Sequence, residues 1–382
     1  MLWFAVACLV PAFVVSLLVT ASMRVLAPRW GLIDKPAARK VHTTPTPLGG
    51  GLGIYFGFVL PVAAAAIAAW VFQGDRAPPV WLPAPLQAML PGLLDRSGEL
   101  WMLLSAATLL SAAGLLDDLR PVSWKPRLAL QLTVAIALVA GGIRGTLFVG
   151  YPWIGAGLTV LWIVGLINSL NFLDNMDMLS GGVGLIAATL FAVMMLTLVG
   201  EPRWLVGGAL LVLVGSLAGF LVHNRPPARI FMGDCGSTVI GMLLATLTVL
   251  GTFYDERLPS KHVILAPLCV LAVPIYDTAT VMWIRLREGR SPFQPDKCHF
   301  SHRLVDLGLT RPGAVRTVHL CTLTTGLGGL LLYRVPGWTG AAMIVAMVLC
   351  VLAIIGVLEN TRRRNGGSPS APSAPHGNGD PS

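Results

Sequence analysis

The sequence predicts an all-α, polytopic membrane protein with about eleven transmembrane helices. Of its 382 residues, 55% are hydrophobic and only 12% are charged, and the mean hydropathy is +0.74. A water-soluble domain of this composition would have too few polar side chains to cover its surface. Roughly 20 apolar residues are enough to cross the hydrocarbon core of a bilayer. Stretches of about this length begin near Leu2, Leu48, Leu100, Arg127, Ile154, Gly181, Trp204, Gly236, Val263, Ala314 and Trp338.

The charge pattern predicts the orientation of these spans. The first stretch has no basic residue before it and several after it, unlike a cleavable signal peptide, so we expect a retained span with the N-terminus outside. Most of the 27 Lys and Arg residues then fall on the cytoplasmic side, as the positive-inside rule requires. This bias and contact with anionic lipid explain the net charge of +9, so no nucleic-acid partner is expected.

We expect residues 1–364 to form a single multi-span transmembrane domain. Residues 365–382 are rich in Gly, Ser and Pro and cannot bury enough apolar surface to fold, which predicts a disordered cytoplasmic tail. The six cysteines lie in apolar stretches or on the reducing side of the membrane, without paired spacing, so no disulfides are expected.

Carboxylates gather near the cytoplasmic ends of the predicted spans. Carboxylates near hydrocarbon are costly and usually mark a metal, a proton path or a substrate. The plain alternative is that span ends simply meet water, but the outer ends show no comparable clusters. The clustered carboxylates on the cytoplasmic side are Asp34, Asp117, Asp118, Asp174, Asp177, Asp234 and Asp277.

Asp117 and Asp118 close the third apolar stretch, and Lys125 and Arg127 follow them. Adjacent helical positions point about 100° apart, so the two carboxylates cannot face one ligand in the same way. We expect one to meet a metal or a reacting phosphate and the other to pair with a cation such as Lys125, whose ammonium also suits phosphate. An ordinary helix end beside a basic loop is the alternative.

Residues 168–177, after the fifth stretch, contain no Lys or Arg. Asn171, Asp174 and Asp177 are three positions apart, so on a helix they would share one face and form an oxygen-rich patch suited to Mg²⁺. A hard cation would also explain why basic residues are missing there.

The connection before the eighth stretch contains Asn224, Phe231 and Asp234, with glycines at positions 233 and 236. Glycines let the backbone approach a ligand, Asp234 is a candidate metal ligand, and the N-terminus of the next span favours phosphate. The alternative is a tight turn between spans.

The most basic connection contains His299, His302 and Arg303, spaced i, i+3 and i+4. On a helical turn they would present one cationic face suited to a diphosphate. Zinc binding through Cys298 and the histidines is a weaker hypothesis, because no second Cys or His pair has ligand spacing. A solvated basic loop is the remaining alternative.

Taken in order, these segments resemble the polyprenyl-phosphate N-acetylhexosamine-1-phosphate transferases of glycosyltransferase family 4. Within that superfamily the resemblance is to the bacterial undecaprenyl-phosphate N-acetylglucosamine-1-phosphate transferases. Each segment is weak alone, but the ordered set is specific. The matching pieces are Gly31–Pro36, Arg39–His42, Pro47–Gly50, Asp117–Asp118 with Lys125, Asn171–Asp177, Asn224, Phe231–Ser237 and His299–Arg303.

The resemblance implies a reaction, a cofactor and a location. N-acetylhexosamine 1-phosphate would pass from a UDP-N-acetylsugar, most simply UDP-N-acetylglucosamine, to undecaprenyl phosphate, releasing UMP and starting lipid-linked surface-glycan synthesis. The resemblance also implies Mg²⁺ or Mn²⁺, an active site on the cytoplasmic face of the bacterial cytoplasmic membrane, and contact with membrane lipid. It leaves a homodimer open.

The resemblance also implies roles for individual residues. Asp174 and Asp234 would hold the metal, and Asp117 or Asp118 would orient or deprotonate the lipid phosphate. Substrate binding would fall to Lys125, Asn171, Asp177, Asn224, Phe231, His299, His302 and Arg303. Two positions depart from the family pattern, because many relatives have histidine in place of Ser301 and glycine in place of Met178.

Two other classes of function compete with this hypothesis. An ion-coupled transporter would carry facing charges near the middle of the membrane, often with internal repeats. Here the charges sit at span ends and no repeat is visible. A catalytically inactive scaffold relative is the other alternative, and retention of all the carboxylates argues against it.

Overall fold

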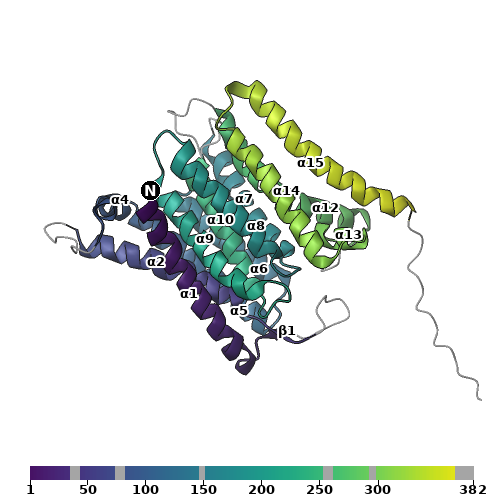
Figure 1. Cartoon of the computed structure of the whole chain (residues 1–382), viewed down its shortest axis with the longest axis horizontal. Coiled ribbons are helices and arrows are strands. Elements are labelled where there is room, and N and C mark those ends of the chain that lie inside the picture. The colour runs from purple at the N-terminus through teal and green to yellow at the C-terminus, as the bar shows by residue number, and fades with distance from the viewer. Residues whose placement is uncertain (35–43, 74–81, 146–150, 253–260, 292–297, 366–382) are drawn as a thin grey trace, which may run out of the picture.

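The structure is a computed structural model that describes residues 1–34, 44–73, 82–145, 151–252, 261–291 and 298–365. Helices dominate the described chain, which confirms the all-α prediction (Figure 1). The helices are α1 (Leu2–Arg29), α2 (Gly50–Val71), α3 (Ala84–Gln87), α4 (Leu90–Asp95), α5 (Ser97–Leu119), α6 (Trp124–Ala140), α7 (Pro152–Leu173), α8 (Leu179–Val193), π-helix η1 (Met194–Leu198), α9 (Trp204–Asn224), α10 (Asp234–Thr252), 3₁₀-helix η2 (Lys261–Leu265), α11 (Ala266–Val270), α12 (Ala272–Arg287), α13 (Phe300–Asp306), α14 (Arg311–Leu331) and α15 (Gly337–Asn365). Strands β1 (Ile33–Asp34) and β2 (Thr46–Pro47) pair antiparallel.

The polytopic prediction is confirmed. Eight helices in the described part of the chain are long and apolar enough to cross a membrane. A ninth span results if η2 and α11 are joined to α12, from which they are bent by 65°. The two other predicted spans correspond to α6, which has only 17 residues, and to α14. The number eleven and the orientation of the termini stay predictions, and the tail from residue 366 lies outside the described residues.

Helix α10 lies at the centre of the bundle. Of its apolar segment 89% is buried, compared with 11% for α1 and 22% for α15. Figure 1 accordingly shows α1 and α15 on the outside, with α15 lying beside α14 at one edge. The first residue of this central helix is Asp234.

Glycines allow three helices to approach α10 closely. A Cβ atom at Gly51 of α2 would lie 2.2 Å from the Gly236 nitrogen, and one at Gly114 of α5 would lie 2.5 Å from the Cys235 nitrogen. On α10 itself, a Cβ at Gly241 would lie 2.6 Å from Ile167 of α7. Small residues permit such backbone contact between membrane helices, where no difference in hydrophobicity drives association.

The segment before α10 is hydrogen-bonded to the segment before α2. The Phe231 nitrogen donates to the Pro47 carbonyl at 2.9 Å, and the Gly50 nitrogen donates to the Phe231 carbonyl at 2.9 Å. These bonds extend the small β1–β2 ribbon, which is itself joined at Ile33 and Pro47. The backbone contacts therefore fix the chain that leads into Asp234.

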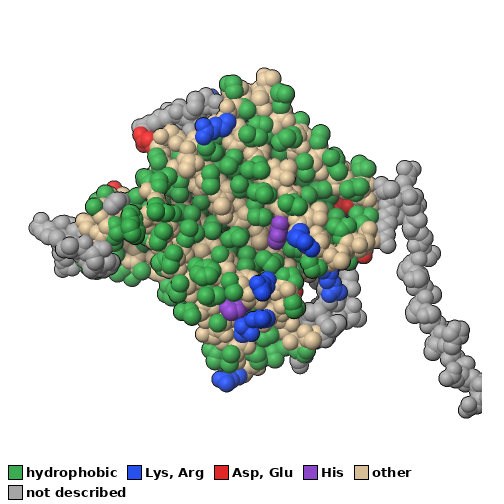
Figure 2. Space-filling view, viewed as in Figure 1, with side chains coloured by type: hydrophobic (Ala, Val, Ile, Leu, Met, Phe, Trp, Pro, Cys, Tyr) green, Lys and Arg blue, Asp and Glu red, His purple; other side chains and the backbone are tan. Residues whose placement is uncertain are grey.

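The molecular surface is mostly apolar. Figure 2 shows hydrophobic side chains over most of one face, with most of the Lys and Arg side chains in its lower half. Exposed apolar residues include Leu18 and Leu161, at 59% and 67%. A surface of this kind needs lipid rather than water as its solvent.

Candidate functional site

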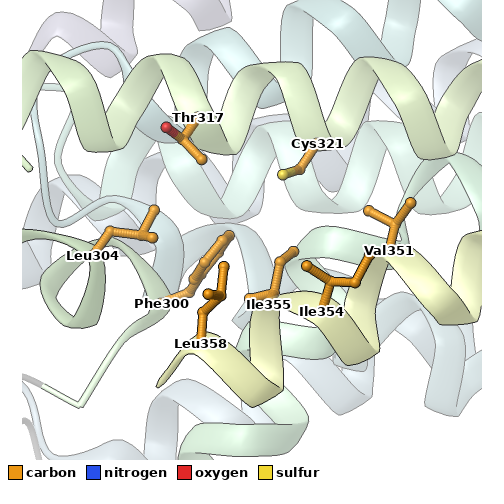
Figure 3. Close-up of a pocket in the computed structure, with 8 residues that line it drawn as sticks. All are labelled: Phe300, Leu304, Thr317, Cys321, Val351, Ile354, Ile355 and Leu358. Carbon is orange, nitrogen blue, oxygen red and sulfur yellow. The ribbon is translucent and has the colours of Figure 1, made fainter. Parts of the chain in front are cut away.

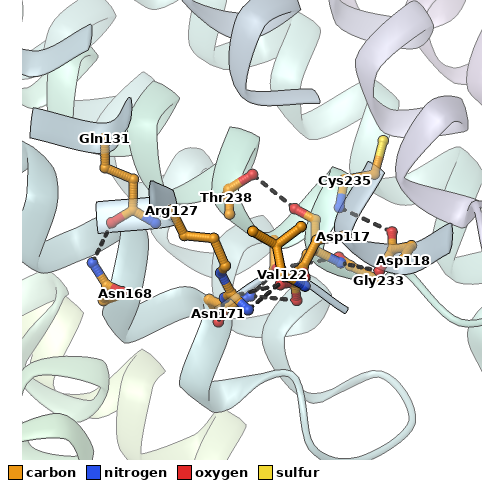
Figure 4. Close-up of polar contacts among 12 residues, drawn as sticks. Asp117, Asp118, Val122, Arg127, Gln131, Asn168, Asn171, Gly233, Cys235 and Thr238 are labelled. Carbon is orange, nitrogen blue, oxygen red and sulfur yellow. Dashed lines mark hydrogen bonds and ion pairs between the residues drawn. The ribbon is translucent and has the colours of Figure 1, made fainter. Parts of the chain in front are cut away.

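The end of α5 caps the start of α10. Asp118 accepts hydrogen bonds from the Asp234 nitrogen at 2.9 Å and the Cys235 nitrogen at 3.2 Å (Figure 4). The first N–H groups of a helix have no partner within the helix, and they favour a negative charge. Gly233 precedes them with a φ of 73°, and a Cβ there would lie 2.4 Å from Asp118 Oδ2. Asp118 thus binds the backbone that carries Asp234.

Arg127 of α6 lies between two carboxylates and an amide. Its guanidinium contacts Asp117 Oδ2 at 2.6 Å and Asp234 Oδ2 at 2.9 Å, and it donates to Asn171 Oδ1 at 3.3 Å (Figure 4). The other oxygen of Asp117 accepts from the Val122 nitrogen at 2.6 Å. The planar fork of an arginine can serve several acceptors at once, which an ammonium cannot do in the same way.

One half of the predicted division between Asp117 and Asp118 is seen, the pairing with a cation, and the contact of the other carboxylate with a metal or phosphate stays a prediction. Asp117 pairs with Arg127, while Asp118 binds backbone N–H groups. Lys125 is exposed, and its ammonium lies 5.9 Å from the centre of the Trp124 ring. Lys125 is the example of a pairing cation expected from the sequence, whereas Arg127 is the residue that pairs with Asp117.

Asn171 connects α7 to α10. Its Nδ2 donates to Asp234 Oδ1 at 2.8 Å and to Ser237 Oγ at 2.9 Å. One turn earlier, Asn168 Nδ2 donates to Gln131 Oε1 of α6 at 2.7 Å, which fixes α6 against α7. Asp234 is therefore held by side chains from both α6 and α7.

The predicted helical spacing of Asn171, Asp174 and Asp177 is wrong. Helix α7 ends at Leu173, and Asp174 has a φ of −79° and a ψ of 57°, so the three side chains do not share a helix face. Asp177 instead accepts from the Ala228 nitrogen at 2.9 Å. The chain must turn here to enter α8, and that turn replaces the expected helix.

Asp174 nevertheless feels the charges of the other carboxylates. Burial raises its pKa to about 8, with the negative charges of Asp234, Asp118 and Asp177 adding to the effect. The raised pKa means that ionising the Asp174 carboxyl group in this environment costs free energy. A cation at this position would remove that cost.

Asn224 is engaged by the backbone at both ends of its amide. Its Oδ1 accepts from the Met178 nitrogen at 2.7 Å, and its Nδ2 donates to the Ile230 carbonyl at 2.9 Å. The residue is 5% exposed. Phe231 is partly buried and lies in the connection that follows Asn224. Asn224 therefore shapes the loops of the site through the backbone.

The predicted cationic face of residues 299–303 is turned inward. His299 Nδ1 donates to Asp277 Oδ2 at 2.9 Å, and the Phe300 nitrogen donates to Asp277 Oδ1 at 2.6 Å. Arg303 donates to Thr280 Oγ1 at 2.9 Å and lies 3.8 Å from Asp277. The buried Asp277 attracts these donors because an unpaired carboxylate there would be costly.

Four further contacts complete this part of the site. Arg303 Nη1 lies 3.2 Å from Glu359 Oε2 of α15, which also accepts from Tyr276 at 3.1 Å. The ring of His302 lies 6.4 Å from that of His299. Ser301 donates to Asn175 Oδ1 at 2.7 Å, so one of the two residues expected to depart from the family pattern connects α13 to the Asp174 loop.

An apolar cavity of about 210 Å³ lies behind α13, between α14 and α15 (Figure 3). Phe300 and Leu304 of α13 form one side of the cavity. Its lining is Phe300, Leu304, Thr317, Cys321, Val351, Ile354, Ile355 and Leu358.

The sequence places Asp277 among the clustered carboxylates without giving it a role of its own, and it assigns no site role to Arg127 or Glu359. Asp277 and Glu359 each lie in a predominantly apolar helix, which is itself a signal, because carboxylates inside such helices usually have a specific partner. Arg127 was visible as a basic residue at the start of a span, but nothing in the spacing distinguished it from Lys125.

Comparisons with known proteins show which family the chain resembles. Residues 100–252, which carry Asp117, Asn171 and Asp234, match the model of glycosyl transferase family 4. A probable undecaprenyl-phosphate N-acetylglucosaminyl 1-phosphate transferase of Bacillus subtilis is 31% identical, over 91% of this chain and 92% of its own length.

Two more relatives extend the match. A decaprenyl-phosphate N-acetylglucosaminephosphotransferase of Mycolicibacterium smegmatis is 32% identical, over 90% of this chain and 86% of its own length. An undecaprenyl-phosphate alpha-N-acetylglucosaminyl 1-phosphate transferase of Escherichia coli is 27% identical, over 95% of this chain and 97% of its own length. The chain therefore belongs to glycosyl transferase family 4, among the polyprenyl-phosphate hexosamine-phosphate transferases.

Proposed function

We propose that this protein transfers N-acetylglucosamine 1-phosphate from UDP-N-acetylglucosamine to a polyprenyl phosphate such as undecaprenyl phosphate. The observation that carries the proposal is the network of Arg127 with Asp117, Asn171 and Asp234 at the ends of four apolar helices. The names of the relatives supply the reaction and the acceptor class. We infer that this end of the bundle faces the cytoplasm, at the cytoplasmic membrane, where UDP-sugars would be found.

In the proposed reaction an oxygen of the acceptor phosphate forms a bond to the β-phosphorus of the donor. The bond from that phosphorus to the bridging oxygen breaks, and its electron pair leaves on UMP. A phosphate monoester has a second pKa near about 6, so the acceptor is largely ionised at neutral pH and needs little help from a base. The protein's contribution is positioning and the neutralisation of charge.

The residues present fit a Mg²⁺ or Mn²⁺ ion whose ligands include both carboxylate oxygens of the protein and phosphate oxygens of the substrate. The site supplies oxygen donors, and ionised Asp174 is costly without a counter-cation. No three His, Cys, Asp or Glu side chains within the described ranges converge on one point. Mg²⁺ is commonly held by one or two carboxylates with phosphates and water. Asp174 and Asp234 would hold the ion, which when bound would neutralise charge on the transferring phosphoryl group.

The other residues have roles that follow from their contacts. Arg127 orients Asp117 and Asp234, and exposed Lys125 is free to approach a phosphate. Asp177 and Phe231, on the loops beside Asn224, would contact the nucleoside. The inward contacts of His299 and Arg303 favour a role in shaping the sugar side of the site over direct clamping of the diphosphate.

The test is UMP release by the detergent-purified protein with undecaprenyl phosphate, Mg²⁺ and UDP-N-acetylglucosamine. We expect release that depends on both substrates, stops with EDTA and returns with added Mg²⁺. Parallel reactions with other UDP-N-acetylsugars identify the preferred donor. Silence with every donor, in protein that elutes as a single folded species, would overturn the proposal and favour the scaffold alternative.

A further inference from the structure

Met178 has an unusual backbone conformation directly beside the site. Its φ is 64° and its ψ is −4°, the left-handed region, and it is the only non-glycine residue with positive φ in the described chain. A Cβ atom makes this region unfavourable, which is why glycine usually occupies it. Met178 directly follows Asp177 and directly precedes α8, so its backbone conformation sets the direction in which the Asp174–Asp177 loop joins that helix.

Two side chains from distant parts of the sequence hold this residue. Asn224 of α9 accepts from the Met178 nitrogen at 2.7 Å. His319 of α14 has its Nε2 at 3.2 Å from the Met178 carbonyl oxygen and 3.3 Å from the Leu179 carbonyl oxygen. Because both of these partners are acceptors only, His319 Nε2 must carry the hydrogen.

The helix that follows Met178 makes room for the imidazole. A Cβ atom at Gly182 would lie 2.3 Å from His319 Nε2 and 2.4 Å from its Cε1. Gly182 is one turn beyond Met178, and its nitrogen donates to the Met178 carbonyl at 2.9 Å. The ring of His319 is therefore packed against the first turn of α8 from α14.

We propose that His319 is a positioning residue that, together with Asn224, holds Met178 in the left-handed conformation and so places the Asp174 loop for transfer. The clamp substitutes for the glycine that this conformation would otherwise require. His319 touches no reacting atom in this account. The inference rests on the proposed function, because the loop matters for turnover only if Asp174 belongs to the active site.

The decisive experiment asks whether the need for His319 depends on Met178. His319→Leu and His319→Gln are made in the native chain and in a Met178→Gly background, and kcat and KM for UMP release are measured. We expect His319→Leu to lower kcat about tenfold in the native chain but only about threefold or less with Met178→Gly, since glycine adopts positive φ without strain. His319→Gln replaces the imidazole N–H with an amide N–H and so keeps a hydrogen-bond donor; it should restore most of kcat with little change in KM.

A matched control separates the clamp from general packing. His262 is 1% exposed, and its Nε2 lies 2.9 Å from the Leu332 carbonyl just beyond the other end of α14. His262→Leu therefore removes the same kind of bond away from the site, and its effect should be equal in both Met178 backgrounds. Gly182→Ala, which would displace the ring of His319, should reproduce the effect of His319→Leu.

Hydrogen exchange gives a readout that needs no turnover. In the full-length protein, the backbone of residues 178–182 should exchange faster in His319→Leu, and the increase should shrink with Met178→Gly. That exchange pattern without UMP release would support the clamp while refuting the proposed function. Equal losses of kcat in both backgrounds, or unchanged exchange, would overturn the clamp.

Discussion

Replacing Arg127 with methionine would remove the cation that pairs with both Asp117 and Asp234. The guanidinium contacts the two carboxylates at 2.6 and 2.9 Å, and the side chains of Arg127, Asp117 and Asp234 are 32%, 9% and 26% exposed. Breaking a buried ion pair costs about 3–5 kcal/mol, whereas an exposed pair contributes about 0.2–1 kcal/mol. For this half-buried arrangement we expect a loss of about 2 kcal/mol in the free energy of unfolding. A transition-state cost of similar size would lower kcat/KM roughly thirtyfold.

The assay for Arg127→Met is kcat/KM for UMP release, with thermal unfolding measured on the same sample. Arg120→Met is the matched control, because Arg120 is an exposed arginine at the end of α5. Adding Asp117→Asn to Arg127→Met should recover part of the loss, since one of the two unpaired carboxylates is then neutral. Activity within about twofold of the native protein would refute the structural role given to Arg127.

Three shorter predictions test other contacts. Asp234→Asn should nearly abolish UMP release with a melting temperature close to native, because it removes a proposed metal ligand and little packing; near-normal turnover would exclude that assignment. Gly233→Ala should lower both stability and kcat, since its Cβ would lie 2.4 Å from Asp118 Oδ2; circular dichroism melting and UMP release check this. Glu359→Gln should lower kcat/KM about threefold to tenfold by weakening the ion pair with Arg303; an unchanged value would limit α15 to a packing role.

The all-α class could be predicted from composition because a membrane span must satisfy its own backbone hydrogen bonds. The segments that meet at the site could also be predicted, since Asp117, Asn171 and Asp234 all follow or begin apolar stretches on one side. Their exact contacts could not be predicted. Asp234 is oriented by Asp118, Asn171 and Arg127 from three other helices, and only the packing of those helices places them together.

The choice between Lys125 and Arg127 shows why side-chain contacts could not be predicted from the sequence. Residues two apart on a helix point about 200° apart, so only one of them can face α7 and α10. Gln131 lies one turn after Arg127 on the same face and bonds Asn168 of α7 at 2.7 Å, which fixes the rotation of α6. That rotation is a tertiary property, and a pattern of basic residues does not contain it.

The inward direction of His299 and Arg303 has a similar origin. Their spacing predicts a shared face, but it does not say which partner the face meets. Asp277 is fully buried, at 0% exposure, and Glu359 lies more than fifty residues further along the chain on α15. Neither Asp277 nor Glu359 is near residues 299–303 in the sequence. The basic segment alone therefore could not predict that these carboxylates accept its hydrogen bonds and ion pairs.

The close packing of α10 also bears on how the site responds to its ligands. Contacts at Gly51, Gly114 and Gly241 leave the backbone of this helix no space in which to shift toward α2, α5 or α7. Asp234 is therefore preorganised: its orientation is completed when the protein folds and does not have to be created when substrate arrives. Because the side chain does not have to reorient during the reaction, its placement adds nothing to the activation free energy. The rigid, glycine-lined packing of α10 would in this way contribute to the rate of transfer.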